Sequence, residues 1–129
     1  MNKILVEVSV GELLDKISIL EIKKEKIKDS KKLQFINDEH VILKNQLIEN
    51  VKSDENIEKL FLSLKNINSK LWVIEDNKRL CEKNSDFSEK FIKLSRDVHF
   101  LNDERAKIKL EIYNLTGSKI KEIKEYTNY

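Results

Sequence analysis

The sequence predicts an all-α protein, an antiparallel four-helix bundle of two long helical hairpins with a short N-terminal strand. Composition favours helices, because the 129 residues include no proline, only two glycines and 37% charged residues. In successive segments the apolar residues are spaced alternately three and four apart, as in coiled-coil packing. A chain of this length suits one helical domain, residues 1–129.

The first expected element is a short strand or extended arm over residues 1–8, because KILVEV is rich in β-branched residues. A helix then begins at a capping box, in which Ser9 accepts from the Glu12 amide and Glu12 reaches back to the Ser9 amide. Its apolar stripe consists of Leu13, Ile17, Leu20 and Ile27.

Three further helices follow from the same kind of stripe. The second is expected over residues 31–52 and the third over residues 55–83. The fourth begins at a cap on Asp86 and ends at Gly117, which suits a left-handed C-terminal cap. Residues 118–129 are expected to form a polar tail.

The third and fourth helices are expected to be longer than the first two, at about 42 Å against about 30 Å. If both hairpins align at the turn near residues 52–55, the far end of the longer hairpin is uncovered. Its apolar residues are Leu80, Cys81, Phe87, Phe91 and Leu94. Monomers rarely expose such a patch, so the sequence predicts a homodimer formed through the long hairpin.

Several functional classes are disfavoured. The net charge of +2 comes from 25 basic and 23 acidic residues that are interleaved, which does not favour nucleic-acid binding. The single cysteine, Cys81, excludes an internal disulfide, and two histidines in different hairpins fit no metal-ligand spacing, so no metal or cofactor is expected. Glu7 interrupts any signal-like apolar core, and no apolar run approaches a membrane span, so we expect a cytoplasmic protein.

Arg105 interrupts the apolar stripe of the fourth helix between Leu101 and Ile108. A buried guanidinium needs a carboxylate partner, and counting the helical rise puts Asp15 and Glu21 near its level. Two interpretations remain open: a structural salt bridge to Asp15 or Glu21, or a bundle pocket in which Arg105 holds an anionic ligand.

A second polar group centres on the segment KLWVIEDNKR in the third helix. Trp72, the acids at 75 and 76, and Arg79 share one helix face. An antiparallel register across the next turn brings Arg96 towards these acids and His99 towards Trp72. The complete group is Trp72, Glu75, Asp76, Arg79, Arg96, His99, Asn102 and Asp103. It forms either an ion-pair network between helices or part of a general-base arrangement that lacks a placed nucleophile.

The segments VSVGELLDKISILEIKKEKI, LWVIEDNKRLCE and LNDERAKIKLEI, with LTGS, resemble an uncharacterised bacterial family of small helical proteins known as a domain of unknown function. The resemblance covers most of the chain, implies an all-helical fold, assigns no catalytic residue and suggests a link to surface-polysaccharide synthesis. ELLDKISILEIKKEKI also resembles the first helix of the all-helical chorismate mutases, which surround a dicarboxylate with arginine and lysine. The corresponding helix here has no arginine, which argues against that activity.

We therefore expect a homodimeric helical interaction or structural protein. The alternative is a small enzyme or ligand-binding bundle that holds an anionic metabolite with Arg79, Arg96 and Arg105.

Overall fold

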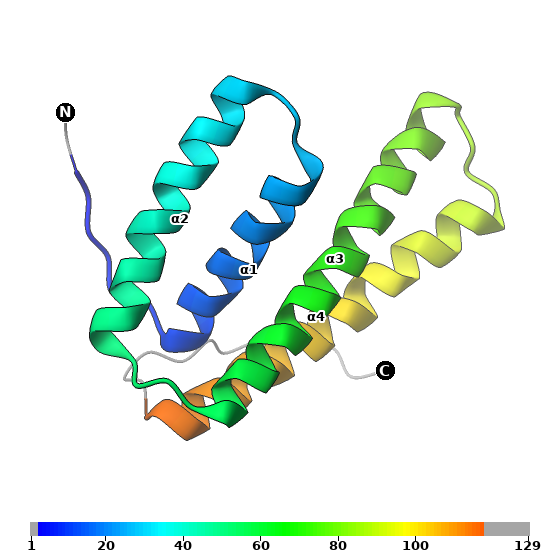
Figure 1. The fold of residues 1–129 in the computed structure, drawn as a ribbon. Coiled ribbons are helices and arrows are strands. Elements are labelled where there is room, and N and C mark those ends of the chain that lie inside the picture. The colour runs from blue at the N-terminus through cyan, green and yellow to red at the C-terminus, as the bar shows by residue number, and fades with distance from the viewer. Residues whose placement is uncertain (1–2, 118–129) are drawn as a thin grey trace.

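The computed structural model describes residues 3–117, which contain four α-helices (Figure 1). The helices are α1 (Val10–Lys26), α2 (Ser30–Asn50), α3 (Glu55–Lys83) and α4 (Glu89–Thr116). The predicted all-α class is therefore confirmed. The predicted polar tail, residues 118–129, lies outside the described residues.

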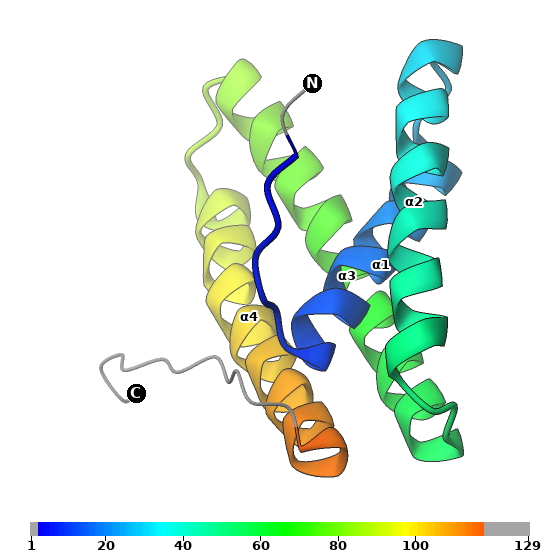
Figure 2. The ribbon, with the colours of Figure 1, turned by 90° about the vertical axis from the view of Figure 1, so that its left-hand side faces the viewer.

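The short strand predicted near the N-terminus does not form. Residues 3–9 carry no regular secondary structure. A strand needs a second strand to share its backbone hydrogen bonds, and the rest of the described chain offers helices and their connections. The segment is instead an extended arm that leaves the start of α1, as Figure 2 shows.

The first three helices begin at residues whose side-chain oxygen accepts a hydrogen bond from a backbone amide within the next three residues. These caps are Ser9, Asp29 and Asp54, with bonds of 3.1, 3.0 and 2.7 Å. The capping box at Ser9 forms in one direction, because the carboxylate of Glu12 accepts instead from Lys109 of α4 at 3.0 Å.

The ends of α4 differ in how well they match the prediction. The helix begins at Glu89 with Ser88 as its N-cap, later than expected. Asp86 accepts from the Ser88 amide at 3.1 Å, so it forms a turn ahead of the helix and leaves Phe87 in the connection. The predicted cap at Gly117 is confirmed, with φ 65° and ψ 31° in the left-handed region.

The helices form two hairpins, α1–α2 and α3–α4, and α1 joins them (Figure 1). The backbone of α1 approaches those of α2, α3 and α4, whereas within the described residues the backbone of α2 approaches that of α1 alone. The arrangement is thus more open than the predicted bundle, in which α2 would also lie along the longer hairpin.

The apolar core lies where α1 crosses the α3–α4 hairpin. Leu14, Leu64 and Ile112, one from each of these helices, are almost completely buried. The residues packed around them are Val10, Leu47, Ile57, Leu60, Phe61 and Ile108. A Cβ atom on Gly11 would lie 3.0 Å from the backbone oxygen of Lys109, so the close approach of α1 to α4 requires glycine there.

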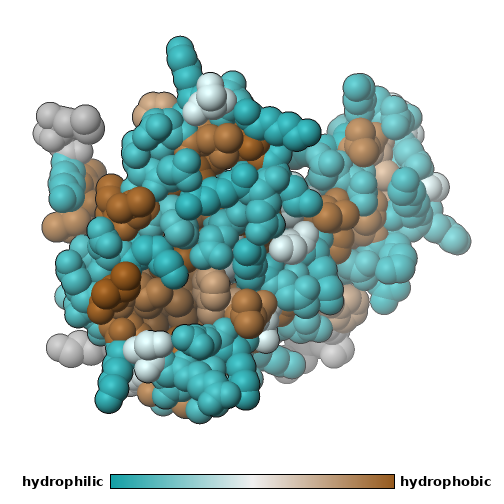
Figure 3. Space-filling view, viewed as in Figure 1, coloured by the Kyte–Doolittle hydropathy of each residue, from teal (hydrophilic) through white to brown (hydrophobic). Residues whose placement is uncertain are grey.

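The distal end of the α3–α4 hairpin extends beyond the helices that cover its base. α3 and α4 have 29 and 28 residues, against 17 in α1 and 21 in α2. Leu80 is 49% exposed and Phe87 is 56% exposed, whereas Phe91 and Leu94 are half-buried. Cys81, which we expected on this patch, is only 3% exposed and does not contribute to the surface. In Figure 3 apolar side chains are visible over this end of the hairpin and over other parts of the same face.

Candidate functional site

The most tightly held polar group is the carboxylate of Asp15 in α1, which is 1% exposed. Arg105 of α4 binds it with two parallel hydrogen bonds, from Nε to Oδ1 at 3.1 Å and from Nη2 to Oδ2 at 2.6 Å. Asn68 of α3 donates to Oδ1 at 2.8 Å, and Lys109 Nζ lies 3.4 Å from Oδ2. One carboxylate therefore connects α1, α3 and α4.

A second shell of hydrogen bonds completes this group. Asn68 also donates to Ser18 Oγ at 2.8 Å, and that hydroxyl donates to the Asp15 carbonyl at 2.7 Å. Lys109 is buried between two carboxylates, because it also donates to Glu12. We call Asp15, Ser18, Asn68, Arg105 and Lys109 the Asp15 cluster. Among the described residues, no buried side-chain nitrogen or oxygen lacks a hydrogen bond, so every buried polar side-chain atom of the cluster has a partner.

The charges around Asp15 determine its ionisation. Burial alone would raise the pKa of its carboxyl group, but hydrogen bonds from Arg105 and Asn68 and the charges of Arg105 and Lys109 outweigh that effect. The net result is a pKa below the usual 3.8. Asp15 is therefore ionised at neutral pH and bound on both oxygens, which suits joining helices better than accepting a proton from a substrate.

Glu21, the other carboxylate considered for Arg105, belongs to a different polar group. Its Oε2 lies 3.4 Å from His40 Nε2 of α2, and its Oε1 accepts from Lys65 Nζ of α3 at 3.4 Å. Lys24 Nζ lies 3.1 Å from the other ring nitrogen of His40. Glu21 thus links α1 to α2 and α3, at a level farther along α1 than Asp15.

A cavity of about 340 Å³ lies between α1 and α3, beside the Asp15 cluster. Its lining residues are Ile19, Ile22, Asn68, Leu71, Trp72, Glu75, Asp76, Arg79 and Arg105. We call it the Trp72 cavity. It brings together the α3 members of the predicted polar group with Arg105. Within residues 3–117, however, no ion pair or hydrogen bond joins Glu75 or Asp76 to Arg79 or Arg96.

The α4 members of the predicted group lie outside the lining of the Trp72 cavity. Arg96 and His99 are exposed, and the His99 ring lies against Phe100 with 4.4 Å between centroids. Asn102 accepts from Arg105 Nη1 at 3.3 Å, and Asp103 is half-buried. His99 does not line the cavity that Glu75 and Asp76 line, and the acid–histidine arrangement expected there stays a prediction.

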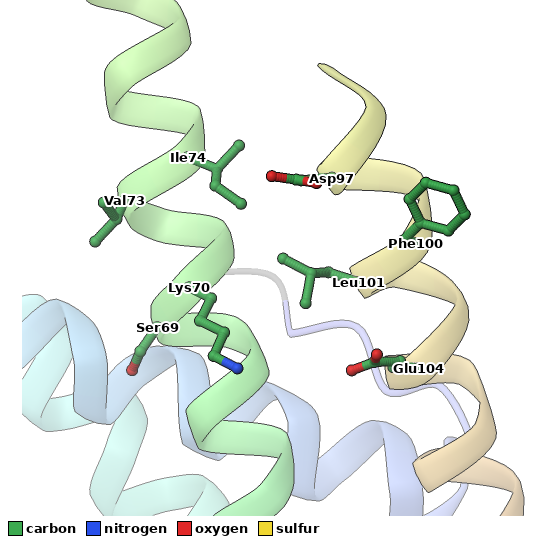
Figure 4. Close-up of a pocket in the computed structure, with 8 residues that line it drawn as sticks. All are labelled: Ser69, Lys70, Val73, Ile74, Asp97, Phe100, Leu101 and Glu104. Atoms are coloured by element: carbon green, nitrogen blue, oxygen red, sulfur yellow. The ribbon is translucent and has the colours of Figure 1, made fainter. Parts of the chain in front are cut away.

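Another feature is a groove between α3 and α4, drawn in Figure 4. It has a volume of about 650 Å³ and is lined by Ser69, Lys70, Val73, Ile74, Asp97, Phe100, Leu101 and Glu104. We call it the α3–α4 groove. Figure 4 shows Lys70 and Glu104 towards one end, and Ile74 and Asp97 towards the other. Ile74 and Leu101 point towards each other between the two helices, whereas Val73 and Phe100 point away (Figure 4), and the other four lining residues are polar or charged.

Sequence reasoning missed three members of the Asp15 cluster. Asn68 follows the buried Ile67 in the middle of a long helix, where asparagine is a poor helix former and so hints at a specific hydrogen bond. Lys109 lies one turn after Arg105, and Ser18 lies one turn after Asp15, so both share a face with a residue that was identified.

Across the described part of the chain, no group of three or more histidine, cysteine, aspartate or glutamate side chains could hold a metal ion. No helix in that part is long and apolar enough to cross a membrane.

These features define a class: an all-helical protein in which buried ion pairs join the helices. The chain belongs to the family described as "Family of unknown function (DUF6165)", whose model matches residues 4–129. The resemblance to a domain of unknown function is therefore confirmed. Neither a curated protein nor a solved structure matches the chain significantly.

Proposed function

We propose that this protein is a homodimeric interaction protein and that its α3–α4 hairpin forms the contact between the two subunits. The observation that carries the proposal is the apolar surface on the part of the hairpin that other helices do not cover. Its exposed members are Val73, Leu80, Phe87, Ile92 and Phe100. Surfaces of this kind on soluble proteins mark interaction sites, because burying them removes apolar area from water.

The apolar surface continues along α3 instead of ending at the tip of the hairpin. Val73 and Leu80 are seven residues apart and so lie on the same face of the helix, two turns from each other. A stable interface takes roughly 20–30 residues from each partner. The tip of the hairpin alone does not supply that many residues, so the proposed contact between subunits extends from the tip along α3 towards Val73.

The polar groups support an interaction role over an enzymatic one. Every buried polar side-chain atom of the Asp15 cluster has a hydrogen-bond partner, and the guanidinium of Arg105 is already bound to a carboxylate. The Trp72 cavity is lined by two carboxylates, Glu75 and Asp76, and by two guanidinium groups, of which that of Arg105 is already paired with Asp15. An anionic metabolite would meet two carboxylates beside one exposed guanidinium, which gives little net attraction. The ligand-binding alternative therefore has less support than the dimer.

The proposal is tested by sedimentation equilibrium on three variants. Leu80→Asp and Phe87→Asp each place a charge on the proposed interface, and we expect both to weaken the dimer by at least about tenfold. Val41→Asp is the matched control, because Val41 is equally exposed, at 56%, but lies on α2. Circular dichroism establishes that each variant is folded. A wild-type monomer at micromolar concentration, or equal weakening in all three variants, would contradict the proposal.

A further inference from the structure

Another cavity, of about 390 Å³, lies between α2 and α3, beside the connection that joins the two helices. We call it the α2–α3 cavity. Its apolar lining residues are Leu14, Leu47, Ile48, Val51, Ile57 and Phe61. Its volume falls within the roughly 300–1,000 Å³ that is usual for small-molecule sites.

Two matching helix faces form the walls of the α2–α3 cavity. The lining residues on α2 and its C-cap are Lys44, Leu47, Ile48 and Val51, and those on α3 and its N-cap are Asp54, Ile57, Glu58 and Phe61. Each set has the spacing of a single helix face, which normally packs against another helix. Within the described residues, however, the backbone of α2 approaches only that of α1. The two faces therefore lie on opposite sides of the cavity instead of packing against each other.

The floor of the α2–α3 cavity belongs to the apolar core. Leu14 is 2% exposed, and Leu47, Ile57 and Phe61 pack around it as half-buried residues. Ile48, which is 73% exposed, lies at the rim. In Figure 3 apolar side chains gather from the lower end of α2 across to the first part of α3. An alkyl chain bound there would remove apolar area of both the ligand and the protein from water.

The charged residues of the α2–α3 cavity differ in whether they have partners. Asp54 accepts from a backbone amide of α3 at 2.7 Å, and Glu58 accepts from Ser53 Oγ at 3.2 Å. Lys44 is half-buried and Lys52 is exposed, and neither makes a hydrogen bond or ion pair within the part of the chain that the structure describes. The two ammonium groups are therefore available to an anion, whereas both acids are engaged at the start of α3.

We propose that the α2–α3 cavity binds an amphipathic carboxylate, a small molecule with an alkyl chain and one anionic end. The chain lies between the two apolar helix faces, and Lys44 and Lys52 hold the carboxylate. Lysine suits this role because its ammonium donates to carboxylate oxygens while its aliphatic stem lies along apolar surface. The site does not depend on the proposed homodimer, because its lining residues lie on α1, on α2, in the connection and in the first two turns of α3.

Isothermal titration calorimetry on the full chain, with octanoate as the probe, tests the class of ligand. We expect saturable binding of octanoate, and binding of butyrate that is weaker by at least about tenfold because most of the apolar chain is missing. Octanol has the chain without the charge and should bind about tenfold more weakly than octanoate. The absence of saturable octanoate binding, or equally tight binding of octanol, would overturn the proposal.

The location of the site is tested by Ile48→Asp and Ile42→Asp, a matched pair on α2. The two isoleucines are 73% and 60% exposed, so neither substitution disturbs the core, but of the two it is Ile48 that lines the cavity. We expect Ile48→Asp to weaken octanoate binding by at least about tenfold, because it places a carboxylate at the rim. Ile42→Asp should change it by less than about twofold. Equal effects of the two substitutions would contradict the assigned location.

The role of the lysines is tested by Lys44→Met and Lys52→Met, which remove an ammonium group and keep an unbranched side chain. Lys31→Met is the control, because Lys31 is exposed near the start of α2. We expect each of the first two variants to weaken octanoate binding by about threefold to tenfold and to leave octanol binding unchanged. A disturbance of the fold would instead weaken the binding of both ligands. The proposal is overturned if neither variant reduces the preference for octanoate over octanol, or if Lys31→Met reduces it equally.

Discussion

Replacement of Arg105 by alanine tests the role of the Asp15 cluster. The substitution leaves Asp15, which is 1% exposed, with the Asn68 amide and the Lys109 ammonium as its partners. Removing one partner of a buried ion pair typically costs about 3–5 kcal/mol. The two remaining partners soften the loss, and the 28% exposure of the Arg105 side chain admits water to the vacated space. We therefore expect the lower end of the range, about 3 kcal/mol.

Urea unfolding at one fixed protein concentration measures this loss as a change in the free energy of unfolding. A decrease of about 3 kcal/mol corresponds to a Tm lower by roughly 10 °C for a chain of this size. Arg96→Ala is the matched control, because Arg96 is exposed and makes no ion pair within the described residues. The control should change stability by no more than about 0.5 kcal/mol. The reasoning is refuted if Arg105→Ala unfolds at the same urea concentration as the wild type.

Two further predictions concern the same contact between α1 and α4. The pKa of Asp15 is lower in the folded than in the unfolded chain, so the folded state binds fewer protons in acid. The stabilisation that the Asp15 carboxylate supplies is complete above about pH 4 and is lost as the pH falls through the folded pKa. The free energy of unfolding in urea, measured from pH 7 to 3, should therefore fall less steeply with acid for Asp15→Asn than for the wild type. Equal slopes for the two proteins would contradict this. Gly11→Ala places a Cβ atom 3.0 Å from the Lys109 carbonyl oxygen, so the substitution should lower the free energy of unfolding by about 1–3 kcal/mol. Thermal unfolding measures this loss, and an unchanged Tm would show that α1 and α4 accommodate the extra methyl group without cost.

The helices were predictable because their signals are local. Ser9 and Gly117 mark helix ends through hydrogen bonds and backbone angles that involve neighbouring residues. Asp86 was assigned the wrong role, because Ser88 also suits a cap and local sequence does not decide between them. The open arrangement was not predictable from stripes, since a stripe shows which face is buried but not which helix covers it.

The polar residues also differ in how far their roles could be predicted from the sequence. Arg105 was identifiable because a guanidinium within an apolar stripe requires a partner, and the structure pairs it with Asp15. Lys109 was less conspicuous, because a lysine can extend its charge to solvent from almost any position. For the group around Trp72, an antiparallel register shows which residues lie at one level but not which face of α4 they occupy, and His99 is an exposed residue whose ring lies against Phe100.

The oligomeric state of the wild-type protein tests the central claim most directly. Light scattering on the purified full chain at micromolar concentration reports its mass in solution. The account predicts twice the chain mass of 15.3 kDa. A mass of one chain would contradict it.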